Sequence, residues 1–443
     1  MPDSRHNRRL GRAGFALLLT LAFLFRLAFG LCLPFWTDDE KQIYLIGLKF
    51  YSTHAWPYFG PDVTNTIQIP GALQGLLVGL PLFVVPVPEA PYVLLNLLSF
   101  AALCFFAWYC TKRLPNLPAW FVWTWLLIAP WTLNLSTHVF NPSYVLVGAI
   151  LFFVGAIETW PAPGIGVIPP RGANFMMGFA LLWVMQLHLS WVVLIPFLLA
   201  SFYFQYQATG RNALPLLAWF AAGAAVSGIF LIPTYVKYGF LSGTGSTGEV
   251  VQVNWHNLRS YLNLPESILG RFLSLASFEL PRFIGRDTSS RMAFIRANAW
   301  LIPFVVFLGI VGLLQPIALL VLWFRKEIVQ KDWRQIKYLT LFTLVLLYVS
   351  FLFSFRAPNS HTLYVTFPVV MLYSLYCWNM YLTRPGWRKF AAVFLVAGVI
   401  FNLGLAAANF HRQSLYLDRA KVQAAIDARD YRILGERREG TRY

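Results

Sequence analysis

Three consecutive carboxylates, Asp38, Asp39 and Glu40, follow directly after an apolar run of about one membrane thickness. Thr37 and Glu40 have the spacing of a capping box, and Asp38 and Asp39 suit the positive end of a helix dipole. Capping accounts for Thr37 and one or two of the acids, but not for a third carboxylate beside the bilayer, where desolvation is costly. A chemical role is therefore equally open, in which an ionised carboxylate orients a hydroxyl or holds a cation.

A second set of polar side chains falls where later apolar runs are expected to end. Arg356 and His361 stand in the stretch SFRAPNSHTLY, which closes with Tyr364. Arg356 suits a snorkelling interfacial anchor as well as a phosphate ligand. A lone histidine at such a boundary is more often a hydrogen-bonded structural residue than a ligand. No zinc-type spacing appears, so no metal site is predicted among the other histidines of this kind, His54, His138 and His188.

The composition indicates the class of protein that must position these groups. Hydrophobic residues make up 58% of the 443 residues and charged residues only 12%, whereas a soluble domain carries about a quarter charged residues. Apolar runs of roughly 20 residues recur along the chain, which predicts an all-α polytopic membrane protein. The formal net charge of +17 is spread between the apolar runs, so membrane anchoring explains it better than nucleic acid.

Hydropathy predicts about eleven transmembrane helices, the first of them an uncleaved N-terminal span. Their expected ranges are Ala13–Phe35, Pro91–Cys110, Ala119–Ser136, Ser143–Ile157, Ala173–Leu187, Trp191–Tyr206, Pro215–Tyr235, Ala299–Phe324, Tyr338–Phe355, Leu363–Leu382 and Phe390–Phe410.

One apolar stretch, Ile69–Val87, decides the topology, because counting it as a span would invert every later loop. If it does not cross, the clustered basic residues share one side, which the positive-inside rule makes cytoplasmic. The three short loops on the other side then carry only Arg356. The cytoplasmic clusters are Arg5–Arg12, Lys112–Arg113, Arg325–Lys337 and Arg384–Lys389. We therefore predict that Ile69–Val87 lies along the outer interface.

Two long loops then face outward, at 36–90 and 234–298. The first is expected to begin with an amphipathic helix lying on the membrane, since Ile43, Gly47 and Phe50 have helical spacing. The second is expected to act as a lid or acceptor gate. Residues 1–410 form the predicted transmembrane domain and 411–443 a polar tail. The site is expected outside the cytoplasm, and the bacterial inner membrane is the expected location.

The order of these features resembles the GT-C membrane glycosyltransferases, above all the protein O-mannosyltransferase and aminoarabinose transferase group. The pair Asp39-Glu40 matches an Asp-Glu pair that opens the first outer loop in that group and acts in catalysis. FNPSYVLVGAILFF resembles the family's entry into the fourth span, with Asn141 where an acid often stands. MGFALLWVMQLHLSWVV, which contains His188, and FRAPNSHTLYVTFPVV resemble two later family segments.

The resemblance implies a glycosyltransferase that moves a sugar, with inversion, from a polyprenyl-phosphate donor to a glycan, lipid or protein acceptor. It implies Asp39 as the base, with Asp38 or Glu40 as an orienting partner. Arg356, His361 and Tyr364 are then candidates for binding the donor phosphate, and His138, Asn141 and His188 for contacts to donor or acceptor. No cofactor is assigned, and a divalent cation near Asp38 and Asp39 is left open.

Other classes remain open from the sequence. A transporter or lipid flippase fits the many spans, although such proteins often carry polar residues in mid-membrane, and here Arg26 is the only charged residue inside a predicted span. A polysaccharide ligase or polymerase fits the arginines of the second long loop but leaves Asp39-Glu40 unexplained. A non-catalytic scaffold of the same fold is the last alternative.

Overall fold

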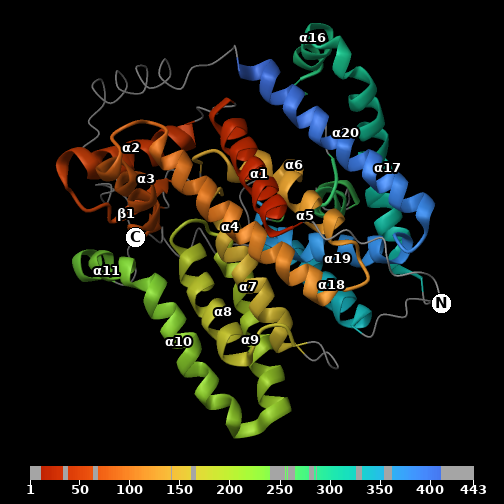
Figure 1. Ribbon diagram of the computed structural model, residues 1–443. Coiled ribbons are helices and arrows are strands. Elements are labelled where there is room, and N and C mark those ends of the chain that lie inside the picture. Colours follow the sequence, from red (N-terminus) through yellow and green to blue (C-terminus); the bar gives the residue numbers. More distant parts are fainter. Residues whose placement is uncertain are drawn as a thin grey trace.

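The computed structural model describes residues 11–32, 38–62, 68–140, 142–160, 166–239, 255, 257, 265–278, 284–285, 287–325, 332–353 and 362–410. Helices dominate this part of the chain (Figure 1). The α-helices of seven residues or more are α1 (Arg12–Cys32), α2 (Asp38–Thr53), α3 (Leu73–Val84), α4 (Ala90–Arg113), α5 (Ala119–Ile128), α6 (Pro130–Ser136), α7 (Val145–Thr159), α8 (Pro170–Met185), α9 (Trp191–Thr209), α10 (Leu214–Gly228), α11 (Ile232–Tyr238), α16 (Thr288–Ala297), α17 (Ile302–Trp323), α18 (Trp333–Leu352), α19 (Phe367–Tyr381) and α20 (Pro385–Phe410).

Short elements complete the description. They are η1 (Gly210–Ala213), η2 (Ile229–Leu231), η4 (Pro265–Gly270), α14 (Arg271–Ser274), η5 (Ala299–Leu301), η6 (Tyr364–Thr366) and the strands β1 (Phe59–Asp62) and β2 (Gln68–Pro70). The two strands pair antiparallel, a small exception to the all-α prediction.

The helices bear out a polytopic membrane protein. Six helical stretches among the described residues are long and apolar enough to cross a membrane, the longest running from Trp191 to Tyr238. Each of the predicted spans contains a helix, while the total of eleven crossings stays a prediction. The predicted span Ala119–Ser136 is not one continuous helix, because it breaks into α5 and α6 at Ala129–Pro130.

The break between α5 and α6 frees backbone carbonyls that side chains then satisfy. Proline lacks the N–H that would continue the helix, and in an apolar interior each freed carbonyl needs another donor. Arg26 of α1 donates to Leu127 O at 2.9 Å, and Asn402 of α20 donates to Ile128 O at 3.1 Å. Thr132 Oγ1 donates to Ala129 O at 2.9 Å. Two distant helices thus hold the broken span in place.

The end of α1 and the start of α4 lie at the same end of the bundle. Asn96 of α4 donates to Thr137 O at 3.2 Å. A Cβ on Gly30 of α1 would stand 2.3 Å from the same oxygen. The chain between α1 and α4 therefore begins and ends on one side, in agreement with the prediction that Ile69–Val87 does not cross. The helix in that stretch, α3, has 12 residues and a length of about 18 Å.

The opposite end of the bundle carries a buried ion cluster. Arg113 of α4 contacts Glu158 of α7 and Asp332, each at 3.1 Å. It also donates to the hydroxyls of Tyr109 and Tyr376 at 3.1 and 3.0 Å. Arg113 and Asp332, expected in cytoplasmic loops, are both only 3% exposed. Burial is tolerated because every charge has partners of opposite sign or hydrogen bonds. The cluster joins the ends of helices that the charge pattern assigns to one side.

The first long loop forms a packed layer, in which the predicted membrane-facing helix is instead buried. Ile43 of α2 is fully buried and Gly47 lies against Val78 and Gly79 of α3. The apolar face of α2 therefore packs on α3 rather than on lipid, because the two glycines allow the helix backbones to approach closely. Figure 1 shows α2, α3 and the strands together on one side of the molecule.

The second long loop is not wholly external, contrary to the prediction. Phe272, Ser277 and Phe278 are at most 1% exposed. The Ser277 hydroxyl donates to Gly312 O at 3.0 Å, a carbonyl that Pro316 of α17 leaves without its helical donor. Gly312 has no side chain, which lets the Phe278 backbone approach. Residues 265–278 thus re-enter the bundle beside the proline-containing part of α17.

Candidate active site

His138 lies just past the end of α6, beside the end of α1. Its ring meets the ring of Phe29 edge-on, with 6.3 Å between centroids. Its Nδ1 lies 3.2 Å from both the Thr137 hydroxyl and the Asn134 carbonyl oxygen. The side chain is buried, at 1% exposure. The sequence predicts this histidine at a helix end, and the structure shows that Phe29 of the first span lies against its ring.

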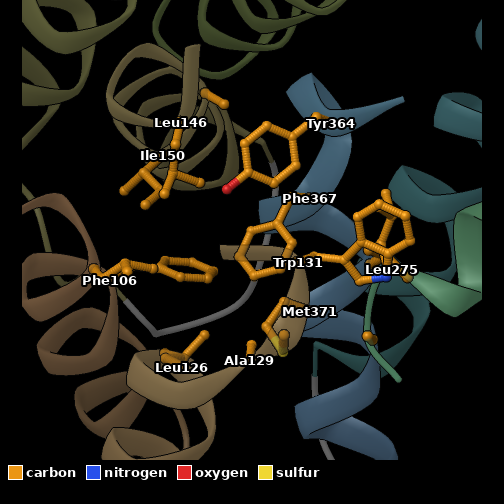
Figure 2. Packing of buried hydrophobic residues seen from close by; sticks show 14 of the residues in the cluster. Phe106, Leu126, Ala129, Trp131, Leu146, Ile150, Leu275, Tyr364, Phe367 and Met371 are labelled. Carbon is orange, nitrogen blue, oxygen red and sulfur yellow. The ribbon is translucent and has the colours of Figure 1, made fainter. Parts of the chain in front are cut away.

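Tyr364 reaches the same region from η6. Its hydroxyl lies 2.5 Å from the hydroxyl of Ser136, two residues before His138. Ser99 of α4 donates to Ser136 O at 2.9 Å, which fixes the end of α6 from the other side. In Figure 2 the Tyr364 ring lies beside Leu146 and Ile150 of α7, among the buried apolar side chains. The structure therefore places one predicted site residue, Tyr364, against Ser136, two residues before the predicted site residue His138.

The base of this region is an aromatic layer that Figure 2 also shows. Phe106 of α4, Phe367 of α19 and Trp131 of α6 lie around Ala129, where the predicted span breaks. Trp131 Nε1 donates to Ser274 O at 2.9 Å, in the re-entrant segment. Residues far apart in sequence thus fix α6, and with it Ser136 and His138, from several sides.

The three carboxylates begin helix α2. Asp38, Asp39 and Glu40 are its first three residues, and the structure describes the backbone of Asp38 and Asp39 but not their side chains. Glu40 is buried, with 3% exposed. Six peptide steps link Cys32 to Asp38, which limits their Cα separation to about 20 Å. Because Phe29 is three residues before Cys32 and contacts His138, the acids begin near the His138 end of the bundle.

His188 belongs to a different part of the molecule. It lies in the turn between α8 and α9, where its Nδ1 is 2.8 Å from the Ser190 hydroxyl. Two residues earlier, Gln186 packs against Gly71 of the first long loop. No contact between described residues joins His188 to His138 or Tyr364. The first loop therefore contacts the turn that carries His188.

Three predicted site residues, Arg356, His361 and Asn141, lie outside the described residues, as does Thr37 of the expected capping box. In the part of the chain that the structure describes, no three His, Cys, Asp or Glu side chains gather in a way that could hold a metal ion.

Sequence reasoning missed Ser136 and left Arg26 unassigned. Arg26 is fully buried and donates to Leu127 O, Thr132 Oγ1 and Thr132 O. It is a positioning residue, because it holds the start of α6. One signal was available: an arginine within an apolar span requires a partner, and Pro130 creates carbonyls that require donors. Ser136 carried no comparable signal.

Comparisons with known proteins define the class of this fold. No family model matches the sequence, and no curated protein matches it. Among solved structures, the chain is similar to ArnT from Cupriavidus metallidurans bound to undecaprenyl phosphate, with a TM-score of 0.53 and 13% identity over 96% of this chain and 77% of ArnT. The protein thus has a GT-C-like fold, as its sequence pattern predicts.

Weaker similarity extends to the archaeal oligosaccharyltransferase AglB from Archaeoglobus fulgidus. One AglB structure, in complex with an inhibitory peptide and a dolichol-phosphate, has a TM-score of 0.44 and 11% identity over 89% of this chain. An apo form of the Archaeoglobus fulgidus oligosaccharyltransferase has a TM-score of 0.41 and 12% identity over 90% of this chain. The chain spans just over half of each, 56%.

Proposed function

We propose that this protein is an integral-membrane glycosyltransferase that moves a sugar from a polyprenyl-phosphate donor to a glycan, lipid or protein acceptor outside the cytoplasm. The observation that carries the proposal is the position of Asp38, Asp39 and Glu40 in the first turn of α2, directly after the first apolar helix, in a chain with the ArnT-like fold. ArnT itself is seen bound to undecaprenyl phosphate.

The reaction needs a carboxylate that takes a proton from the acceptor hydroxyl as that oxygen attacks the sugar. We assign this role to Asp39, with Asp38 or Glu40 orienting it. The first turn of a helix supports the assignment, because the free N–H groups and the helix dipole favour an ionised carboxylate there. Attack opposite the departing phosphate inverts the configuration at the sugar carbon.

The phosphate that departs needs positive charge and hydrogen-bond donors. Arg356 and His361 are the proposed donors, because both precede Tyr364, whose hydroxyl lies with Ser136 at the His138 end of the bundle. His138, Asn141 and His188 are proposed contacts to acceptor or donor. An arginine is suited to this role, since its planar group can donate two parallel hydrogen bonds to a phosphate.

The test is sugar transfer from a panel of radiolabelled polyprenyl-phosphate sugars, with membranes carrying the wild type or Asp39→Asn. Glu89→Gln is the matched control, because it neutralises a carboxylate of the same loop, at the N-cap of α4. We expect label to leave the lipid with the wild type and Glu89→Gln, and transfer with Asp39→Asn to fall by at least about 100-fold, the effect of removing a general base.

Three outcomes separate the alternatives. Unchanged transfer with Asp39→Asn removes Asp39 as the base while leaving a glycosyltransferase, and Asp38→Asn and Glu40→Gln then identify the acid in use. No transfer from any donor by folded wild-type protein favours a transporter, a flippase or an inactive scaffold. A loss of sugar transfer with Asp39→Asn supports Asp39 as the base only if the Asp39→Asn protein melts at the same temperature as the Glu89→Gln protein.

A further inference from the structure

A groove lies between α17, α19 and α20, away from the candidate active site. Its volume is about 250 Å³, and its lining is apolar except for Gln315. Leu314 lines one edge with 55% of its surface exposed, and Trp378 lines the interior with 8% exposed. The groove therefore opens on the face of the bundle that meets lipid.

The groove runs along one half of the membrane thickness. On α17 its lining extends from Val311 to Leu322, which is about 16 Å along a helix. Half of the hydrocarbon core is about 15 Å thick. The other lining residues, Cys377 to Tyr381 and Trp387 to Phe390, come from the end of α19 and the start of α20. The groove thus matches the depth of a single leaflet, at the end of the bundle opposite to Tyr364.

Arginines stand three residues before and one residue after Trp387, an exposed residue of the groove lining that marks its mouth. Arg384 precedes α20 and Arg388 lies one turn later on the same face, and both are exposed. Arg388 uses its Nε to donate to Leu382 O at 2.6 Å, which positions its guanidinium at this end. The sequences of α17, α19 and α20 contain no Asp or Glu. Trp387, at the same mouth, is a residue type that favours the level of lipid head groups.

We propose that this groove binds one acyl chain of an anionic glycerophospholipid from the leaflet at the Arg384 end. The apolar walls take the chain, and Arg384 and Arg388 take the phosphate, since a basic cluster at this level attracts anionic head groups. The inference does not depend on the proposed catalytic function, because the groove shares no residue with the candidate active site.

The experiment is photo-crosslinking of the full-length protein in phosphatidylcholine nanodiscs containing a trace of phosphatidylglycerol with a diazirine in its acyl chain. We expect label on peptides that carry Trp378 to Phe390 and Val311 to Leu322. Ala318→Trp fills the groove, and label there should fall by about tenfold, because excluding even two methylenes from an apolar site has that effect. The matched control is Leu320→Trp, on the exposed outer side of α17, and should leave the label unchanged.

A second pair of variants tests the head group. Arg384→Gln should remove the preference for phosphatidylglycerol over a phosphatidylcholine probe, whereas Lys389→Gln, in the second turn of α20, should preserve it. Equal labelling in Ala318→Trp and wild type overturns the proposal. So does equal labelling by both probes in the wild type, or displacement of the label by undecaprenyl phosphate.

Discussion

Arg26 of α1 and Leu127 at the end of α5 are joined by a hydrogen bond of 2.9 Å from Nη1 to the carbonyl oxygen. The same guanidinium donates to Thr132 Oγ1 and Thr132 O, each at 3.1 Å. Pro130 breaks the span between Leu127 and Thr132. One fully buried arginine therefore closes the gap between α5 and α6, and α6 leads directly to Ser136 and His138.

We expect Arg26→Met to destabilise the protein by about 1–3 kcal/mol, the effect of leaving a buried carbonyl without a donor. Sugar transfer should fall as well, since α6 carries Ser136 and precedes His138. Arg26→Lys keeps a charged donor group and should recover part of the stability, but not the forked contact that the planar guanidinium makes. The measurement is thermal unfolding in detergent, with Leu24→Met as the control on the exposed face of α1. Equal melting temperatures for Arg26→Met and Leu24→Met would contradict the assignment.

The buried cluster at the other end of the bundle gives a second prediction. Arg113→Gln leaves Glu158 and Asp332 without their counter-charge, and we expect a loss of about 3–5 kcal/mol, as for other broken buried ion pairs. Arg171→Gln, at the exposed start of α8, should change stability little. Adding Asp332→Asn to Arg113→Gln should restore part of the loss, because the double variant buries one charge fewer. A double variant no more stable than the single one would count against this coupling.

The close approach of α2 and α3 gives a third prediction. A Cβ on Gly47 would lie 2.5 Å from a Val78 methyl carbon and 2.9 Å from the Gly79 nitrogen. Gly47→Ala must therefore separate the two helices, at a cost of about 1–3 kcal/mol. Because α2 carries the three acids at its start, transfer should fall too. The control is Gly386→Ala in α20, where no atom lies within 4 Å and alanine should be neutral or stabilising. Activity and unfolding are measured together.

The start of α16 gives a prediction on pH. The Ser290 backbone N–H, with the hydroxyls of Ser289 and Ser290, lowers the pKa of Asp287 to about 2. A carboxylate with a lowered pKa stabilises the fold above its ordinary value of about 4 and loses this effect as the pH falls through its lowered value. We therefore expect pepsin to cut α16 faster at pH 2 than at pH 4.

Two variants check the origin of that pH dependence. Asp287→Ala should be cut rapidly at both pH values, because it has no cap. Asp287→Asn keeps a side-chain oxygen that can accept from the Ser290 N–H, so its rate should not change between pH 4 and pH 2 beyond the change in pepsin activity on a control peptide. The same pH dependence in Asp287→Asn as in the wild type would show that another group titrates.

The sequence alone determined the membrane class and the approximate positions of most helices. Hydropathy and charge are properties of local runs, and a bilayer admits few backbone structures other than helices, so these features follow from short stretches. The three acids at Asp38–Glu40 stood out for the same reason, since charge is rare in this chain. The prediction of a GT-C-like fold rested on the order of such local features, and the likeness to ArnT confirms it.

The tertiary structure alone decided which distant groups meet. Arg26 bonds to a carbonyl 101 residues away, and Arg113 to a tyrosine 263 residues away. Local periodicity contains no information about such pairs. The burial of α2 on α3, the re-entry of residues 265–278 and the meeting of Ser136 with Tyr364 likewise depend on how apolar faces and unpaired carbonyls find partners once the helices pack. Packing, rather than local pattern, therefore places α6 beside α1 and assembles the candidate site.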